Sequence, residues 1–374
     1  MEQGSAVKLL LEDSRVNVDL RNYGGRTPLS LAAEAGDAYI VERLLARGAD
    51  PGSRDIGQTT PLWYAARAGH GATIELLLLT RRVTLKTLNS KQPYHRSGQG
   101  DTPLAIAARN GHAQVVRLLL GEAGIDPYKG NVQAYWETTP LRVAVAARDE
   151  EVAELLLEKS VQPEAKDRWG KTALSIAVDR GQKSIVKMLL AEKLVDRNSK
   201  DYQGRTPLSS AVGRGDKAIV ELLLENGGAD LQCKDDLGFT PLSRAAYGSE
   251  YSSGGNDNHE VVALLLATGR VEINSRDYEG RTALSHAANR GHAATVRLLL
   301  SYPGIDAEPK DKHGWTPLLL AVSETHQAIV QHLLTMQDVN PNSRDKTGLT
   351  PLSAAAKEGR GEIVRILLGW KGVD

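Results

Sequence analysis

Residues 201–224 read DYQGRTPLSSAVGRGDKAIVELLL, and this stretch decides the fold. Asp201 to Gly204 has the composition of a turn, and Thr206 followed by Pro207 is typical of a helix N-terminus. The apolar residues that follow recur at helical spacing as far as Gly215, a residue type that commonly ends helices with a positive φ. Residues 219–224 predict a second, more apolar helix. One helix pair of this size cannot bury its apolar faces alone and must stack on neighbouring pairs.

The same pattern recurs along the 374-residue chain. A Thr-Pro-Leu or Thr-Ala-Leu triplet begins at Thr27, Thr60, Thr102, Thr139, Thr172, Thr206, Thr240, Thr282, Thr316 and Thr350. Successive triplets are 33 to 42 residues apart, and a base period near 33 residues indicates a stacked repeat. The sequence therefore predicts an all-α solenoid of about ten helix pairs in a right-handed stack.

Composition narrows the class of protein further. The 46 basic residues balance the 46 acidic ones, so no long-range field draws the chain to nucleic acid or to an anionic membrane. Its single cysteine, Cys233, excludes a disulfide within the chain and fits a reducing compartment. The N-terminal residues do not fit a signal peptide, and no apolar run approaches the roughly 20 residues of a membrane span. We expect a soluble cytoplasmic protein, with the nucleus as the alternative location.

The repeat resembles the ankyrin repeat, most clearly in DYEGRTALSHAANRGHAATVRLLL, residues 277–300, and DKTGLTPLSAAAKEGRGEIVRILL, residues 345–368. The resemblance covers nearly the whole chain and implies a single ankyrin-repeat domain, residues 1–374. It divides into a half repeat, residues 1–21, and repeats that start near residues 22, 55, 97, 134, 167, 201, 235, 277, 311 and 345. Neither end shows a polar capping repeat, so we expect either that the chain is part of a longer protein or that its capping repeats have an unusual sequence.

One column departs from the usual ankyrin pattern. The residue after Thr-Pro-Leu, usually His, is Ser in six repeats: Ser30, Ser175, Ser209, Ser243, Ser285 and Ser353. This variant is similar to the ankyrin tails of large fungal receptor-like proteins.

Catalytic and metal-binding motifs are not found in the sequence. His259 and Glu260 match the start of the zincin motif H-E-x-x-H, but Ala263 occupies the position of the second His. The nine histidines are scattered and no Cys/His cluster has metal-ligand spacing. We predict no catalytic residue, no metal site and no cofactor, and we leave open whether the chain is an enzyme.

The resemblance implies that the turns form a row of fingers and that the first helices line a concave face. Aromatic and Arg residues, the composition of interface hot spots, gather there in the middle repeats. The predicted binding residues are Tyr135, Trp136, Arg142, Trp169, Arg180, Tyr202, Arg214, Arg244, Tyr247, Tyr278, His286, Asn289, Arg290 and Trp315.

Each of these residues also has a structural interpretation. An Arg in the last helical turn complements the helix dipole, and Tyr or Trp in a finger can shield or staple the next finger. Arg244 and His286 stand out because each places a polar group in a column that is usually apolar, where it requires a partner or water. Arg142 is a third such residue, one column earlier.

Two functions are consistent with this pattern. The first is a monomeric binding scaffold that recognises a protein or peptide through the concave face and fingers. The alternative is a small-molecule-binding or catalytic protein with a pocket around Arg244, Tyr247 and His286. Acidic residues interrupt the basic positions, so a nucleic-acid groove is a poor fit, and no membrane partner is expected.

Two insertions lengthen the regular repeat. Residues 80–100 form a basic connection that we expect on the finger side between the second and third repeats. About eight residues are inserted between the two helices of the seventh repeat, within residues 247–258, in a stretch rich in Ser, Gly, Asn and Asp. Tyr247 and Tyr251 flank its start and could anchor its base. The insert is either a tolerated surface loop or a flap beside the groove.

Overall fold

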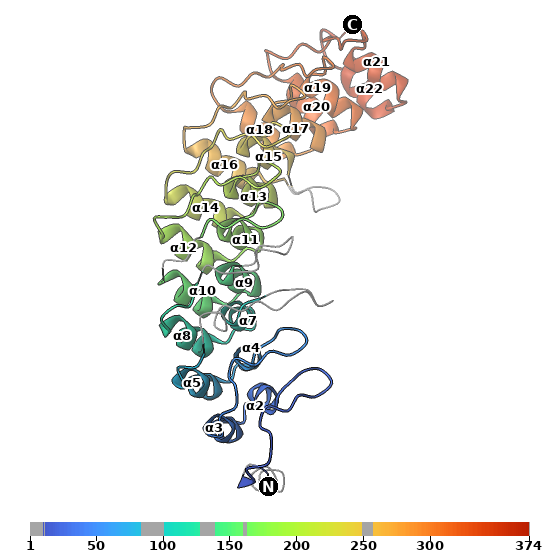
Figure 1. The fold of residues 1–374 in the computed structure, drawn as a ribbon. Helices are drawn as coiled ribbons and strands as arrows, with labels where there is room; N and C mark the ends of the chain where they lie inside the picture. Colours follow the sequence, from blue (N-terminus) through green and yellow to red (C-terminus); the bar gives the residue numbers. More distant parts are fainter. Residues whose placement is uncertain are drawn as a thin grey trace. The chain divides into compact units, whose positions relative to one another are not determined.

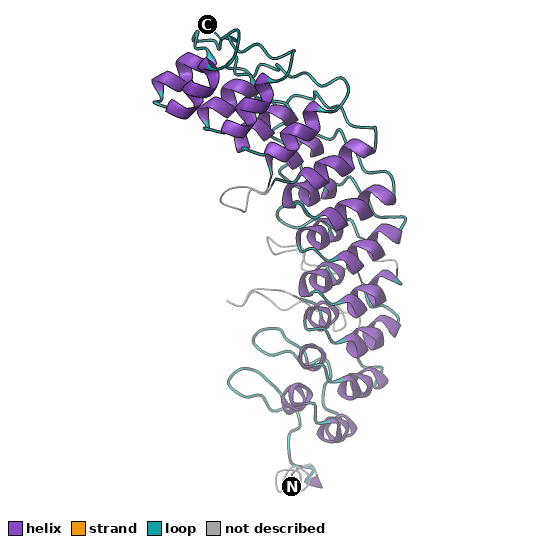
Figure 2. Cartoon of the chain, turned by 180° about the vertical axis from the view of Figure 1, so that it is seen from behind, coloured by secondary structure: helices purple, strands orange, loops and turns teal. Residues whose placement is uncertain are grey.

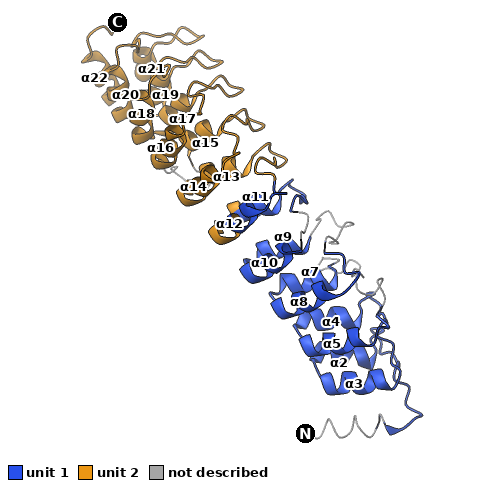
Figure 3. Ribbon diagram, turned by 90° about the vertical axis from the view of Figure 1, so that its left-hand side faces the viewer, with its two compact units in different colours: residues 1–177, 187–195 blue, residues 178–186, 196–374 orange. Residues whose placement is uncertain are grey.

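The computed structural model describes residues 10, 12–83, 101–127, 139–159, 163–248 and 257–373. Contacts divide the chain into two units, residues 1–177 with 187–195 and residues 178–186 with 196–374. Figure 3 colours them separately. The described residues contain helices, turns and loops and no strand, so the predicted all-α class is confirmed. The boundaries of a single domain over residues 1–374 stay a prediction.

The described residues of unit 1 contain four helix pairs. They are α2 (Pro28–Ala35) with α3 (Ala38–Ala46), α4 (Pro61–Ala68) with α5 (Gly71–Leu79), α7 (Pro103–Arg109) with α8 (Ala113–Gly121), and α9 (Pro140–Ala147) with α10 (Glu150–Leu157). Each first helix packs on the next first helix, and each second helix on the next second helix. A further pair, α11 (Ala173–Asp179) and α12 (Lys183–Ala191), includes residues of both units.

Unit 2 repeats this two-layer arrangement (Figure 1). Its pairs are α13 (Pro207–Arg214) with α14 (Lys217–Glu225), α15 (Pro241–Tyr247) with α16 (His259–Ala267), α17 (Ala283–Arg290) with α18 (Ala293–Leu300), α19 (Pro317–Ser323) with α20 (Gln327–Leu334), and α21 (Pro351–Lys357) with α22 (Gly361–Leu368). The finger loops precede the first helices, and in unit 2 they project side by side (Figure 3).

Capping residues explain where the first helices begin. The side chain of Thr206 accepts a hydrogen bond from the backbone N–H of Ser209, and Pro207 occupies the first turn, where it has no N–H to leave unpaired. The same arrangement recurs at Thr27, Thr60, Thr102, Thr139, Thr240, Thr316 and Thr350. Thr282 caps α17 in the same way, with Ala283 in place of proline.

The six serines of the unusual column have a physical role in this cap. Each Ser hydroxyl lies within hydrogen-bonding distance of the capping Thr hydroxyl, from 3.0 Å for Thr206–Ser209 to 3.3 Å for Thr172–Ser175 and Thr282–Ser285. The other pairs are Thr27–Ser30, Thr240–Ser243 and Thr350–Ser353.

Helix ends are determined by residues in the left-handed conformation. Gly215 ends α13 with a φ of 72°, which glycine adopts without steric cost. At the end of α19 the same turn is made by Thr325 with a φ of 66°, an unfavourable backbone for a β-branched residue. The core between the layers consists of small aliphatic side chains, with residues such as Ala211, Val220 and Leu223 almost fully buried.

Candidate functional site

Six of the described fingers are organised by an aspartate. One carboxylate oxygen of Asp277, Oδ1, accepts hydrogen bonds from the backbone N–H groups of Glu279 at 2.9 Å and Arg281 at 2.8 Å. These two bonds close the finger turn. Asp167, Asp201, Asp235, Asp311 and Asp345 accept the same pair of backbone bonds.

The second oxygen of the finger aspartate binds a polar side chain of the helix that follows. His286 Nε2 lies 2.8 Å from Asp277 Oδ2, Arg244 pairs with Asp235, and Tyr64 donates to Asp55 at 2.6 Å. In all three cases the partner stands nine residues after the aspartate. Arg244 and His286 are only 4% and 2% exposed, so these predicted binding residues hold the finger to its helix from within the protein.

Other finger aspartates are held from the preceding repeat. Arg142, 7% exposed, lies 3.8 Å from Asp167, and Arg281 Nε lies 3.1 Å from Asp311. Burial alone would raise the pKa of Asp345, but hydrogen bonds from the Thr347 side chain and from the amides of Leu349 and Thr347 hold it below its usual value. Trp315 is half-buried, and its backbone N–H donates to Asp311 Oδ1 at 2.9 Å within its own finger.

Burial and hydrogen bonding move both pKa values of the Asp277–His286 pair. Burial lowers the pKa of His286, and this effect outweighs the opposing hydrogen bond to Asp277. Burial alone would raise the pKa of Asp277, but hydrogen bonds from His286 and from the amides of Arg281 and Glu279 hold it below its usual value. The arrangement is therefore a neutral imidazole that donates to a carboxylate.

An aromatic cluster joins Phe239, which directly precedes the N-cap of α15, to residues of α15 and α17. Phe239 stacks on the His286 ring at 4.5 Å between centroids. The Arg244 guanidinium lies 4.4 Å from the centroid of the same Phe239 ring. Tyr247 packs edge-on against Phe239 at 5.5 Å and against His286 at 5.6 Å. Arg290 covers the Tyr247 ring at 4.7 Å. Sequence reasoning missed Phe239, although its position before Thr240 belongs to the column that contains Arg205, Arg281 and Trp315.

These contacts bear on the alternative pocket around Arg244, Tyr247 and His286. Two of its three residues are buried and paired with finger aspartates, and their side chains pack against Phe239. The polar groups are therefore already engaged within the protein, and no observation favours a reacting group at this position.

Large apolar side chains are exposed on successive fingers of unit 2. Tyr202 is 68% exposed, Leu237 58% and Tyr278 57%. The three fingers are joined by backbone hydrogen bonds, from Asp236 N–H to the Gln203 carbonyl at 3.0 Å and from Tyr278 N–H to the Leu237 carbonyl at 3.3 Å. We call Tyr202, Leu237 and Tyr278 the finger ridge.

The remaining predicted binding residues have different settings. Arg180 and Arg214 are exposed, while Tyr247, Asn289 and Arg290 are half-buried. In unit 1, Trp169 is exposed and the Arg168 guanidinium lies 3.9 Å from its ring centroid. Tyr135 and Trp136 of the fourth finger lie outside the described residues, as do Tyr251 and residues 84–100 of the long connection.

Both ends of the insert in the seventh repeat are described. Gly248 has a φ of 84° and a ψ of −171°, a conformation restricted to glycine, so α15 does not end in the left-handed turn that ends α13 and α17. The Asp257 carboxylate accepts a hydrogen bond from Ala294 N–H at 2.8 Å, at the start of α18. Asn258 lies against Gly215, where His70, His112 and His326 lie against the corresponding glycines of other repeats.

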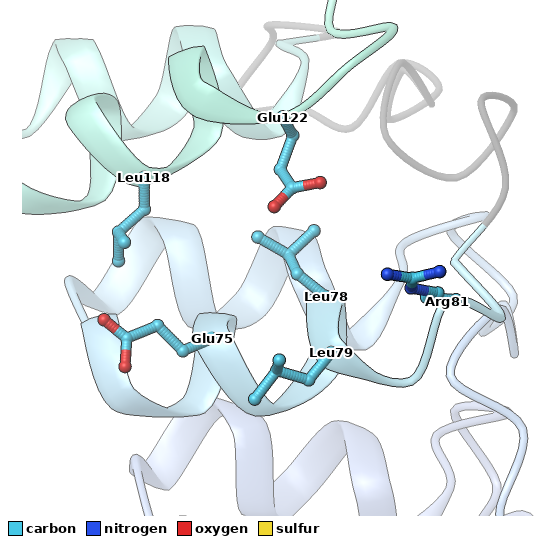
Figure 4. A pocket seen from close by; sticks show the side chains of 6 residues that line it. All are labelled: Glu75, Leu78, Leu79, Arg81, Leu118 and Glu122. Carbon is cyan, nitrogen blue, oxygen red and sulfur yellow. The ribbon is translucent and has the colours of Figure 1, made fainter.

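A separate groove lies among the second helices of unit 1 (Figure 4). It has a volume of about 480 Å³ and is lined by Leu78, Leu79 and Leu118 with Glu75, Arg81 and Glu122. Leu79 is 75% exposed, at a position where α14 has Glu225.

Among the described residues, no helix is long and apolar enough to span a membrane. The described part of the chain also holds no group of three or more His, Cys, Asp or Glu that could bind a metal ion.

Comparison with known proteins agrees with this architecture. The family model for ankyrin repeats in three copies matches nine overlapping stretches, from residues 1–87 to residues 302–374. The chain is similar to the crystal structure of the ankyrin repeat domain of Bcl-3, a member of the IκB protein family, with 31% identity and a TM-score of 0.54. That match covers 64% of this chain and 100% of the Bcl-3 chain. No curated protein matches the sequence. The chain belongs to the ankyrin-repeat family.

Proposed function

We propose that the chain is a binding scaffold that grips a protein or peptide partner with its fingers and first helices. The observation that carries this proposal is the finger ridge. Tyr202, Leu237 and Tyr278 are large apolar side chains, each more than half exposed, on three hydrogen-bonded fingers in a row. Single exposed apolar residues are common on protein surfaces, but contiguous ones mark interaction sites.

The buried polar pairs support the same proposal. The bonds from Asp235 to Arg244 and from Asp277 to His286 fix two fingers on their helices. A surface that is rigid before binding loses less conformational entropy when the partner arrives. In this proposal Arg142, Arg244 and His286 position the fingers, while Trp169, Tyr202 and Tyr278 make the contacts.

Several parts of the proposal rest on the sequence or on the family. The type of partner follows the general use of ankyrin repeats as protein-interaction modules. A monomeric state and a location in the cytoplasm or the nucleus remain predictions. A small molecule is the alternative partner.

The proposal can be tested by selecting peptides that bind the full chain. A random 12-residue peptide library displayed on phage is selected on the immobilised protein, and the best peptide is synthesised with a fluorophore. Fluorescence anisotropy then gives its affinity for the wild type and for a double variant, Tyr202→Ala with Tyr278→Ala. Losing two exposed aromatic anchors is expected to weaken binding by about tenfold or more.

The matched control is Tyr39→Ala. Tyr39 is also an exposed tyrosine, but it lies on the second helix α3, so this change is expected to leave the affinity unaltered. The proposal fails if no peptide binds the wild type, or if Tyr39→Ala weakens binding while the double variant at the finger ridge does not.

A further inference from the structure

Two arginines on the first helices of unit 2 differ from their neighbours because their charged groups form no ion pair within the described part of the chain. Arg214 is the last residue of α13 and Arg290 is the last residue of α17. Their guanidinium groups make no hydrogen bond or ion pair with the described residues, although Arg290 covers the Tyr247 ring. Arg281, in contrast, pairs with Asp311, and Arg244 pairs with Asp235. The donors of Arg214 and Arg290 are therefore available to an outside group.

A fixed aromatic ring lies on the helix between these arginines. Helix α15 packs against both α13 and α17, and it ends at Tyr247 because Gly248 has a non-helical conformation. The Tyr247 ring is held by Phe239 at 5.5 Å, by His286 at 5.6 Å and by Arg290 at 4.7 Å. Three contacts of this kind fix the ring before binding, as expected of an aromatic anchor.

The charge changes sign at the next two helices. The positions that follow α19 and α21 are occupied by Glu324 and Glu358, and both residues are exposed. Along the ends of the first helices the order is thus Arg214, Tyr247, Arg290, Glu324 and Glu358. Such an order favours a partner segment with acidic residues opposite the two arginines and none opposite the two glutamates.

We propose that Arg214, Tyr247 and Arg290 form a recognition site for an acidic peptide segment, an inference that rests on the proposed binding function. Each arginine takes a carboxylate through charge-assisted hydrogen bonds, and Tyr247 packs against an apolar residue between them. Neighbouring helices lie about 10 Å apart, so the two arginines are about 20 Å apart. An extended peptide rises about 3.3 Å per residue, so the two acidic residues are separated by about six positions.

The test uses the same displayed 12-residue library as its probe, selected in parallel on three full-length proteins. These are the wild type, the double variant Arg214→Glu with Arg290→Glu, and the control Arg297→Glu. Arg297 is an exposed arginine of the second helix α18, so the control reverses one similar charge in the other layer. Circular dichroism confirms that each variant keeps its helix content.

The wild type and the control are expected to select peptides with acidic residues about six positions apart, and the double variant is expected to select basic ones. The charge-neutral pair Arg214→Gln with Arg290→Gln should weaken the wild-type peptide by about tenfold or more. The inference is overturned if the double variant selects the same peptides as the wild type. If peptides bind and depend on Tyr202 and Tyr278 but not on these arginines, the scaffold function stands and the acidic site does not. If no peptide binds any of the proteins, both proposals fail.

Discussion

At the scale of single residues, the two carboxylate oxygens of Asp277 accept hydrogen bonds from different partners. Oδ1 closes the finger turn through backbone amides, and Oδ2 binds His286. The sequence predicted the turn, because Asp is typical of this position, and it singled out Arg244 and His286 as polar residues in an apolar column. It did not reveal the partner, because the aspartate and the residue nine positions later meet only once the finger folds back on its helix.

His286→Gln tests the neutral histidine. The folded protein lowers the pKa of His286 below its ordinary value of about 6.5, so the unfolded chain binds the proton first as the pH falls. The contribution of His286 to stability therefore falls as the pH drops below about 6.5. Glutamine keeps a donor for Asp277 but does not titrate. Urea unfolding at pH 7.5 and pH 5.0 should show a smaller loss of stability on acidification for the variant than for the wild type. An equal loss would mean that His286 is not held neutral.

Thr325→Gly tests the strained end of α19. A β-branched residue with a φ of 66° costs about 1–2 kcal/mol relative to glycine, which occupies this position after α13 and α17. Part of that gain is offset because glycine also has more freedom in the unfolded chain. We expect the free energy of unfolding to rise by up to about 1 kcal/mol. The neighbouring change Glu324→Gly, at an ordinary φ of −94°, should give no such rise. Destabilisation by Thr325→Gly would contradict the strain.

At the scale of helices, the sequence predicted the caps but not the role of the serine column. Thr, Pro and Gly marked the ends of the first helices, because their backbone preferences are local. The six serines appeared only as a departure from the usual repeat. Their hydroxyl contacts with the capping Thr, such as Thr206–Ser209 at 3.0 Å, depend on a side-chain arrangement that no spacing rule reveals. The anchoring of Asp257 on α18 was equally hidden, since 37 residues separate the bonded groups.

Ser209→Ala measures this hydroxyl contact. Ser209 is buried and bonded to the cap, whereas the next residue, Ser210, is half-buried and makes no such bond. Removing the Ser209 hydroxyl should cost about 0.5–1.5 kcal/mol, the usual net value of a hydrogen bond. Ser210→Ala should cost nothing or stabilise slightly, because alanine is the better helix former. Equal effects of the two changes in thermal unfolding would show that the Ser209 contact adds nothing.

Leu223→Ala measures the packing between the two layers. Leu223 of α14 is 1% exposed, and truncating a buried leucine typically costs 2–5 kcal/mol, about what we expect here. Leu222 is half-buried, so the same truncation there should cost clearly less. Urea unfolding of the two variants makes the comparison. A cost below about 1 kcal/mol for Leu223→Ala would place this side of α14 outside the core.

At the scale of the whole molecule, the repeat pattern was sufficient to predict the family, because each repeat has the same turn, cap and apolar positions. The nine stretches matched by the ankyrin model span residues 1–374. The partner could not be predicted in the same way, since related repeats share their buried positions and differ in their exposed ones. The predicted site residues separate into two groups for this reason: Arg142, Arg244 and His286 serve the interior, while Tyr202, Arg214 and Tyr278 face solvent.

Hydrogen exchange with and without the selected peptide tests the central claim, that the fingers and first helices bind the partner. Saturating peptide should slow amide exchange in the finger segments 201–206, 235–240 and 277–282 and at the ends of α13 and α17, because bound surface opens less often. Exchange in the second helices α14, α16 and α18 should not change. Protection confined to those second helices, with the fingers unaffected, would contradict the account.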